Sequence, residues 1–215
     1  MNRFLIRYLR LSPCALLLSC TSAYHSLKPA SVDVACAGKM VPFTIATSWY
    51  QASIDVASKH LSGLLLIKNM PDSSQRVVFT NEAGVTFFDF GFKKREKFMV
   101  HSIIKKFNRK PVIKTLRKDF AMMLGEPFAR GGLQSWKTQD ENFFGVTQNK
   151  ETAYFITDKD CSSLRRLELG TKRKRKVSIE IKGAGYPLPD TLNITHFTFP
   201  LQIRLMHFQK NDSSQ

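Results

Sequence analysis

The chain has 215 residues, of which 43% are hydrophobic, so it can bury a core and wholesale disorder is excluded. Its 33 lysines and arginines against 17 acidic residues give a formal charge of +16. Four cysteines are too few for a disulfide scaffold, and no run of about 18 apolar residues predicts a membrane-spanning helix. The length allows one large domain or two small ones.

Residues 1–19 have the layout of a secretory signal peptide. The first ten residues include Arg3, Arg7 and Arg10 and no acidic residue, and a short, mostly apolar stretch follows. Leu17-Leu18-Ser19-Cys20 then resembles the lipobox of bacterial lipoproteins. The resemblance implies that the Cys20 thiol is acylated and that cleavage leaves Cys20 as the new N-terminus. The alternatives are an ordinary cleaved signal and a buried helix with an incidental cysteine.

A lipid on Cys20 would make membrane lipid the first partner of the chain. Two or three acyl chains form a stable anchor, because each buried CH₂ contributes about 0.8 kcal/mol. We expect a cell-envelope protein on the outer membrane, facing the periplasm. Thr21 permits this location, because aspartate after the cysteine retains some lipoproteins in the inner membrane.

Residues 20–48 are expected to hold the lipidated cysteine and a tether, because small and polar residues are frequent there. Cys36 and Cys161 remain after cleavage. They could pair in an oxidising envelope, or lie apart as two small buried hydrophobes, and we favour the second interpretation.

Short strands dominate the next part of the chain. Strands are predicted at 49–56, 60–68, 76–80 and 85–92, with a further candidate at 97–104. In the fourth of these, every second residue from Phe88 to Phe92 is a phenylalanine, which predicts one aromatic face.

One amphipathic helix is predicted at 111–124. Pro111 suits a first helical turn, apolar residues such as Leu116 and Phe120 follow at helical spacing, and Gly125 with Pro127 ends the pattern. Residues 125–139 look like a loop. Strands resume at 142–147, 152–157, 164–169 and around 177–181, and the β-rich end at 191–208 is interrupted by Pro200.

The expected fold is mainly β (α+β), a strongly curved antiparallel sheet or half-barrel of about 10–11 strands, with the inserted helix as a plug on its concave side. We expect a single lipid-binding-like domain at 49–210 and a short tail at 211–215.

Two stretches resemble the outer-membrane lipoprotein carrier and receptor (LolA/LolB-like) superfamily. The first is the meander from Ile54 to Phe92, with its HLSGLLLIK, RVVFTNE and GVTFFDF segments. The second is the C-terminal pattern, PDTLNI followed by PLQIRL. The lipobox agrees with the receptor-type members, which are themselves lipoproteins.

The resemblance implies an eleven-stranded half-barrel with helices as a lid and an apolar cavity that takes acyl chains. It also implies an acyl chain or a lipoprotein as cargo. The receptor members expose a leucine on a loop near the start of the sheet, where the loop 70–75 of this chain offers Met70.

Phenylalanine is abundant, with 17 residues. Those in predicted strands form either a packed core or part of the lining of an acyl-binding cavity. Both alternatives have the same sequence pattern. The candidates for the cavity, with two apolar residues of the helix, are Phe79, Phe88, Phe90, Phe92, Leu116, Phe120, Phe197 and Phe199.

The densest run of positive charge lies between two predicted strands and consists of Lys172, Arg173, Lys174, Arg175 and Lys176. It is either a solvated hairpin or a surface for anionic lipid. The export signal argues against nucleic acid as a partner.

No enzyme, cofactor or metal is expected. The five histidines lack metal-ligand spacing, and no nucleophile elbow, phosphate-binding loop or dinucleotide fingerprint occurs. Paired acids such as Asp140-Glu141 and Asp158 with Asp160 fall in predicted loops and look solvated.

The sequence therefore predicts a non-catalytic lipid-anchored envelope protein that binds acyl chains or lipoproteins in a half-barrel. The alternative is a structural or interaction lipoprotein with a packed sheet, whose basic face docks a protein partner or an anionic membrane surface.

Overall fold

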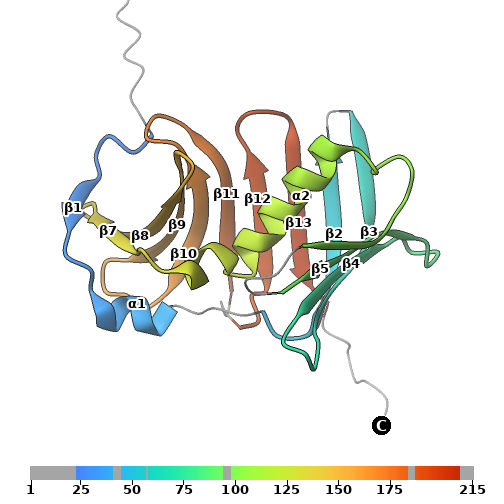
Figure 1. Cartoon of the computed structure of the whole chain (residues 1–215), viewed down its shortest axis with the longest axis horizontal. Coiled ribbons are helices and arrows are strands. Elements are labelled where there is room, and N and C mark those ends of the chain that lie inside the picture. The colour runs from blue at the N-terminus through green and yellow to red at the C-terminus, as the bar shows by residue number, and fades with distance from the viewer. Residues whose placement is uncertain (1–22, 41–44, 57, 94–97, 184–186, 209–215) are drawn as a thin grey trace, which may run out of the picture.

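The computed structural model describes residues 23–40, 45–56, 58–93, 98–183 and 187–208. In this part of the chain, thirteen antiparallel strands form one open sheet, accompanied by two α-helices and a 3-10 helix (Figure 1). The strands are β1 (Lys28–Ala30), β2 (Ser48–Val56), β3 (Lys59–Asn69), β4 (Gln75–Thr80), β5 (Thr86–Phe92), β6 (Met99–Ile103), β7 (Gln134–Lys137), β8 (Glu141–Gln148), β9 (Glu151–Asp158), β10 (Leu164–Gly170), β11 (Arg175–Lys182), β12 (Thr191–His196) and β13 (Leu201–His207). The helices are α1 (Val34–Met40), α2 (Lys110–Met123) and the 3-10 helix η1 (Glu126–Arg130).

The predicted mainly β, antiparallel fold is confirmed, although the strands are more numerous than the ten or eleven expected. The sheet runs β1-β7-β8-β9-β10-β11-β12-β13-β2-β3-β4-β5-β6. The last strand therefore pairs with the second, with Leu201 opposite Val56 and His207 opposite Tyr50. This pairing joins the two halves of the sheet at its centre, so that residues distant in sequence share one core.

The aromatic face predicted in β5 is part of that core. Phe88, Phe90 and Phe92 are buried, and Phe88 lies opposite Phe79 of β4. The rings of Phe88 and Phe90 stack with their centroids 4.6 Å apart. Alternation along the strand places these side chains on one face, as the period-two spacing indicates.

Helix α2 packs its apolar side on the sheet. Leu116, Phe120 and Met123 are buried, and the Phe120 ring lies 5.7 Å from that of Phe88. In Figure 1 the helix crosses in front of the middle strands of the sheet. It ends where Gly125 adopts a left-handed φ of 72°, a conformation that glycine takes without strain, and Pro127 follows in η1.

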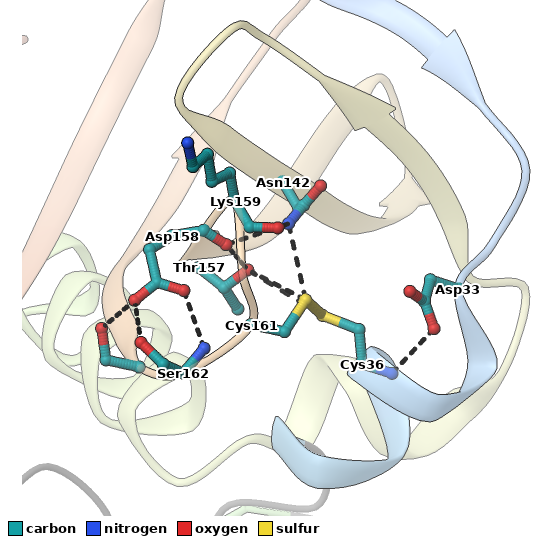
Figure 2. Close-up of a disulfide and its surroundings, with 9 residues drawn as sticks. Asp33, Cys36, Asn142, Thr157, Asp158, Lys159, Cys161 and Ser162 are labelled. Carbon is teal, nitrogen blue, oxygen red and sulfur yellow. Dashed lines mark hydrogen bonds between the residues drawn. A yellow bond between two sulfur atoms is a disulfide. The ribbon is translucent and has the colours of Figure 1, made fainter.

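Residues 23–40, expected to be part of a tether, are instead built into the fold. β1 pairs with β7, and α1 buries Cys36 and Ala37. A disulfide joins Cys36 to Cys161 in the β9–β10 turn (Figure 2), so our preference for two separate buried thiols was wrong. Local composition could not show this, because the partners lie 125 residues apart.

Hydrogen bonds hold both ends of this disulfide (Figure 2). The Asp33 carboxylate accepts a hydrogen bond from the Cys36 backbone N–H at 2.9 Å, at the start of α1. Asn142 of β8 donates to the carbonyl oxygens of Asp158 and Lys159 at 2.9 and 3.0 Å, which fixes the turn that carries the other cysteine.

A second, smaller cluster lies on the opposite face of β8 and β9. Tyr24, Phe143, Tyr154 and Ile156 form it, with Trp136 packed at its edge. Successive residues of a strand point to opposite faces, so Tyr154 belongs to this cluster while its neighbour on the strand packs in the main core. The segment that begins at residue 23 is thereby fastened to the back of the sheet.

Candidate functional site

Six of the eight residues predicted to line an acyl cavity are buried in packed core. They are Phe79, Phe88, Phe90, Phe92, Leu116 and Phe120. The Phe120 ring of α2 packs against the Phe88 ring of β5, with centroids 5.7 Å apart. Phe197 and Phe199 were predicted to lie in a strand, which is wrong. They lie in the β12–β13 turn and are 53% and 41% exposed, because Pro200 ends the ladder there.

Open space lies along the other side of α2, between the helix and strands β8 to β12. Two hollows of about 290 and 160 Å³ occur there. Lys114, Lys118, Glu151 and Leu169 line both hollows, so we treat them as one cleft and call it the α2 cleft. None of these four residues was singled out as a site residue from the sequence.

The floor of the α2 cleft is apolar. Helix α2 contributes Ala121 and Met122, and the strands contribute Val146, Ala153 and Leu169. Met122, Val146 and Ala153 are buried, and Leu169 is half-buried. A surface of this kind can cover an alkyl chain without a specific polar contact.

The rim of the cleft is cationic. Lys118 and Lys176 each donate a hydrogen bond of 2.7 Å to the Glu151 carboxylate, one to each oxygen. Partial burial opposes ionisation of Glu151, but the two ammonium groups outweigh it and leave its pKa below the usual value. Lys114 and Arg117 are exposed along the same side of the helix, so the rim holds more positive than negative charge.

A buried acid–imidazole pair lines the smaller hollow of the cleft, at the end of β12 that leads into the β12–β13 turn. Asp119 of α2 and His196 of β12 lie 2.9 Å apart, with side chains 1% and 4% exposed. Burial raises the pKa of the Asp119 carboxyl, and the hydrogen bond with His196 opposes the rise. The pair ties the helix to the sheet. Sequence gave no signal for it, since the two residues are 77 positions apart.

The predicted basic run does not act as one unit. Lys172, Arg173 and Lys174 are exposed in the β10–β11 turn. Arg175 instead lies 3.4 Å from the buried Glu168 carboxylate, and Lys176 is bonded to Glu151. Lys172, Arg173 and Lys174 therefore form the exposed tip of this turn.

Two of the acidic residues predicted to be solvated, Asp158 and Glu141, instead bond to other side chains or backbone groups of the protein. The Asp158 carboxylate accepts hydrogen bonds from the Ser162 N–H and from the Ser162 and Ser163 hydroxyls. Glu141 pairs with Arg166. Asp158 is buried at the end of β9, whereas Asp160 is exposed as expected. Across the described ranges, no three histidine, cysteine, aspartate or glutamate side chains converge as metal ligands.

Two further predictions concern Cys20 and Met70. Cys20 falls outside the described residues, so its predicted lipidation stays a prediction. Met70, which takes the place of the exposed leucine of the receptor proteins, is only half-exposed in the β3–β4 turn. Neither helix in the described part of the chain is long and apolar enough to cross a membrane.

No protein-family model matches the chain, and a search of curated proteins finds no significant match. The fold and the cleft define the class of protein only as an open antiparallel sheet with a helix laid across it. The function is therefore argued from the cleft itself.

Proposed function

We propose that this protein is a non-catalytic, lipid-anchored envelope protein that binds an acyl chain, of a lipid or of a lipoprotein, in the α2 cleft. The observation that carries the proposal is the combination of an apolar floor with a cationic rim in the two adjoining hollows of the cleft. An alkyl chain would cover the floor, at about 25 cal/mol for each Å² of apolar surface removed from water. An anionic head group would meet Lys114 and Arg117.

Helix α2 is the proposed plug of this half-barrel. One side of the helix packs against β5 through Phe120, and the other side borders the cleft. A longer chain would be admitted by a shift of the helix away from β8 and β9. The Asp119–His196 pair would then keep the helix attached to β12. Binding of this kind needs no covalent chemistry.

The location rests on the N-terminal sequence. The lipobox-like residues that end in Cys20 support acylation, and Thr21 permits the outer membrane, facing the periplasm. The LolA/LolB-like resemblance supports lipoprotein localisation as the process served.

Ligand binding is tested by adding bulk to the floor of the cleft. Ala121 lines the cleft at a half-buried position of α2, beside the main core, so Ala121→Trp should fill the cleft. We expect the variant to bind a fluorescent fatty-acid probe at least about tenfold more weakly than the wild-type chain, because the probe loses apolar contact area. Probe fluorescence in a titration gives both affinities.

Ala35→Trp provides the matched control, since Ala35 is exposed on α1 and does not line the cleft. It should bind the probe as the wild type does. Equal affinity of the two tryptophan variants, or failure of the wild type to bind any acyl probe, would overturn the proposal. Native mass spectrometry of the protein purified from an envelope-competent host supplies a second measurement, in which a co-purified lipid is expected.

A further inference from the structure

One end of the sheet gathers three hairpin turns. They connect β8 to β9 at 149–150, β10 to β11 at 171–174, and β12 to β13 at 197–200. Because these strands are neighbours and antiparallel, their connecting turns fall at the same end (Figure 1). We call this end the hairpin edge. The opposite edge carries the β9–β10 turn, with Cys161, and helix α1 bonded to it.

The hairpin edge exposes aromatic side chains. Phe197 and Phe199 are among the most exposed large apolar residues that the structure describes. Their turn lies beside the basic turn, because the Phe197 backbone N–H donates to the Lys176 carbonyl oxygen at 2.9 Å. The Arg175 guanidinium lies over the Phe197 ring, 5.2 Å from its centroid. An exposed phenylalanine can place its apolar ring below the head groups of a bilayer while neighbouring cations stay at the surface.

The same edge is positively charged. Lys172, Arg173 and Lys174 are exposed at the tip of the β10–β11 turn, and Lys150 is exposed in the neighbouring turn. Each cation near an anionic membrane contributes attraction that salt weakens. Charge complementarity therefore favours an anionic partner, and the aromatic rings favour one with an apolar interior.

The N-terminal segment is attached to this edge. The Ala23 N–H donates to the Arg173 carbonyl oxygen at 3.3 Å. The next residue, Tyr24, is buried and donates its hydroxyl hydrogen to Glu168 at 3.0 Å. Three residue steps separate Cys20 from Ala23 and span at most about 11 Å. An acylated Cys20 would therefore hold this edge of the sheet close to the bilayer surface.

We propose that the hairpin edge docks on an anionic lipid bilayer. Phe197 and Phe199 enter the interface, and Lys172, Arg173 and Lys174 contact lipid phosphates. The surface adjoins the α2 cleft, because Phe199 also lines the smaller hollow, but docking does not require that the cleft bind anything. The distance to the anchor rests on the proposed lipidation of Cys20, whereas the exposed rings and cations do not.

The test compares full-length chains that all carry Cys20→Ser and so cannot be acylated. Each is mixed with phosphatidylcholine vesicles with or without phosphatidylglycerol, and the bound fraction is measured by flotation. Combined K172Q, R173Q and K174Q substitutions should weaken partitioning onto the anionic vesicles by about a hundredfold. Combined F197S and F199S substitutions should weaken it by about tenfold.

The matched control removes three charges from the opposite edge, through K39Q, K68Q and K159Q. These lysines are exposed on α1, near the end of β3 and in the β9–β10 turn. Since every chain shares residues 1–22, differences between variants report the two edges alone. The control should lose much less binding, because its charges lie beyond the screening length from the membrane.

Three results would overturn the proposal. Equal losses from the two charge variants would mean that net charge, not this edge, drives association. Equal binding to both kinds of vesicle at low salt would exclude an anionic target. Unchanged binding of the double phenylalanine variant would exclude insertion of the aromatic turn. Probe binding in the α2 cleft is measured separately, and the triple charge variant leaves the lining of the cleft unchanged, so either proposal can fail without the other.

Discussion

Asp158 shows how one side chain couples the β9–β10 turn to pH. Hydrogen bonds from Ser162 and Ser163 stabilise its ionised form, against an opposing effect of burial, and bring its pKa from 3.8 to about 2. A carboxylate whose pKa is lowered by folding stabilises the protein fully above its unfolded pKa. That stabilisation is lost as the pH falls through the folded value.

We therefore predict that Asp158→Asn makes the protein less stable at pH 4 and above, and that its difference from the wild type shrinks between about pH 4 and pH 2. The amide cannot ionise, so it gains nothing from the serine donors as the pH rises. Urea unfolding at each pH measures the two free energies. Asp160→Asn, at an exposed position of the same turn, should follow the wild type throughout. A constant gap for Asp158→Asn would contradict the assignment.

At the scale of elements, α1 depends on its covalent link. It is only seven residues long, which is too short for a stable isolated helix. Its buried face consists of Cys36 and Ala37. The disulfide to Cys161 closes a loop of 125 residues, and such a constraint acts mainly by lowering the entropy of the unfolded chain.

Replacing both cysteines by alanine, as Cys36→Ala with Cys161→Ala, should lower the free energy of unfolding by about 2–4 kcal/mol. Urea titration followed by circular dichroism measures the change. The wild-type chain in strong reductant should approach the stability of the double variant, which itself should not respond to reductant. A wild-type chain insensitive to reductant would show that this crosslink contributes little.

The elements that sequence predicted well are those with a local period. The strand at 49–56 and the helix at 111–124 match β2 and α2 to within one residue at each end, because alternation and helical spacing are visible in a short window. β1, α1 and β7 were missed. β1 contains Pro29, α1 is short, and β7 has four residues, so each exists through contacts with distant parts of the sheet.

In the candidate site, too, local patterns were predictable from the sequence and contacts between distant residues were not. The charged side of α2, including Lys114 and Lys118, was foreseeable from helical spacing, and so was the buried row that holds Phe120. Glu151 and Lys176 gave no local sign that they would meet across the cleft, because only the order of strands brings them together. Phe197 and Phe199 fit an alternating strand pattern, but the structure places them in the turn before Leu201 instead.

At the scale of the whole molecule, the two proposed functions occupy adjoining regions that share Phe199. The α2 cleft lies between the helix and β8 to β12, whereas the hairpin edge is formed by the turns at one end of those strands. The β8–β9 and β10–β11 turns belong to strands that also wall the cleft. A bilayer that contacts the hairpin edge would therefore lie at one end of the cleft, which is the geometry needed for an acyl chain to pass between them.

The single sheet also predicts that the molecule unfolds as one unit. Pairing of β13 with β2 joins its two halves, and one main core runs through both. The chain has two tryptophans, Trp49 in β2 and Trp136 in β7, so each half contains its own fluorescent reporter. Single-tryptophan variants, Trp49→Phe and Trp136→Phe, should each show a fluorescence midpoint in urea that coincides with the midpoint from circular dichroism of the same variant.

Comparison within one variant removes any effect of the substitution on stability. A fluorescence midpoint displaced from the circular dichroism midpoint in either variant would mean that the halves unfold separately, and that the β13–β2 pairing is a boundary between two cooperative units.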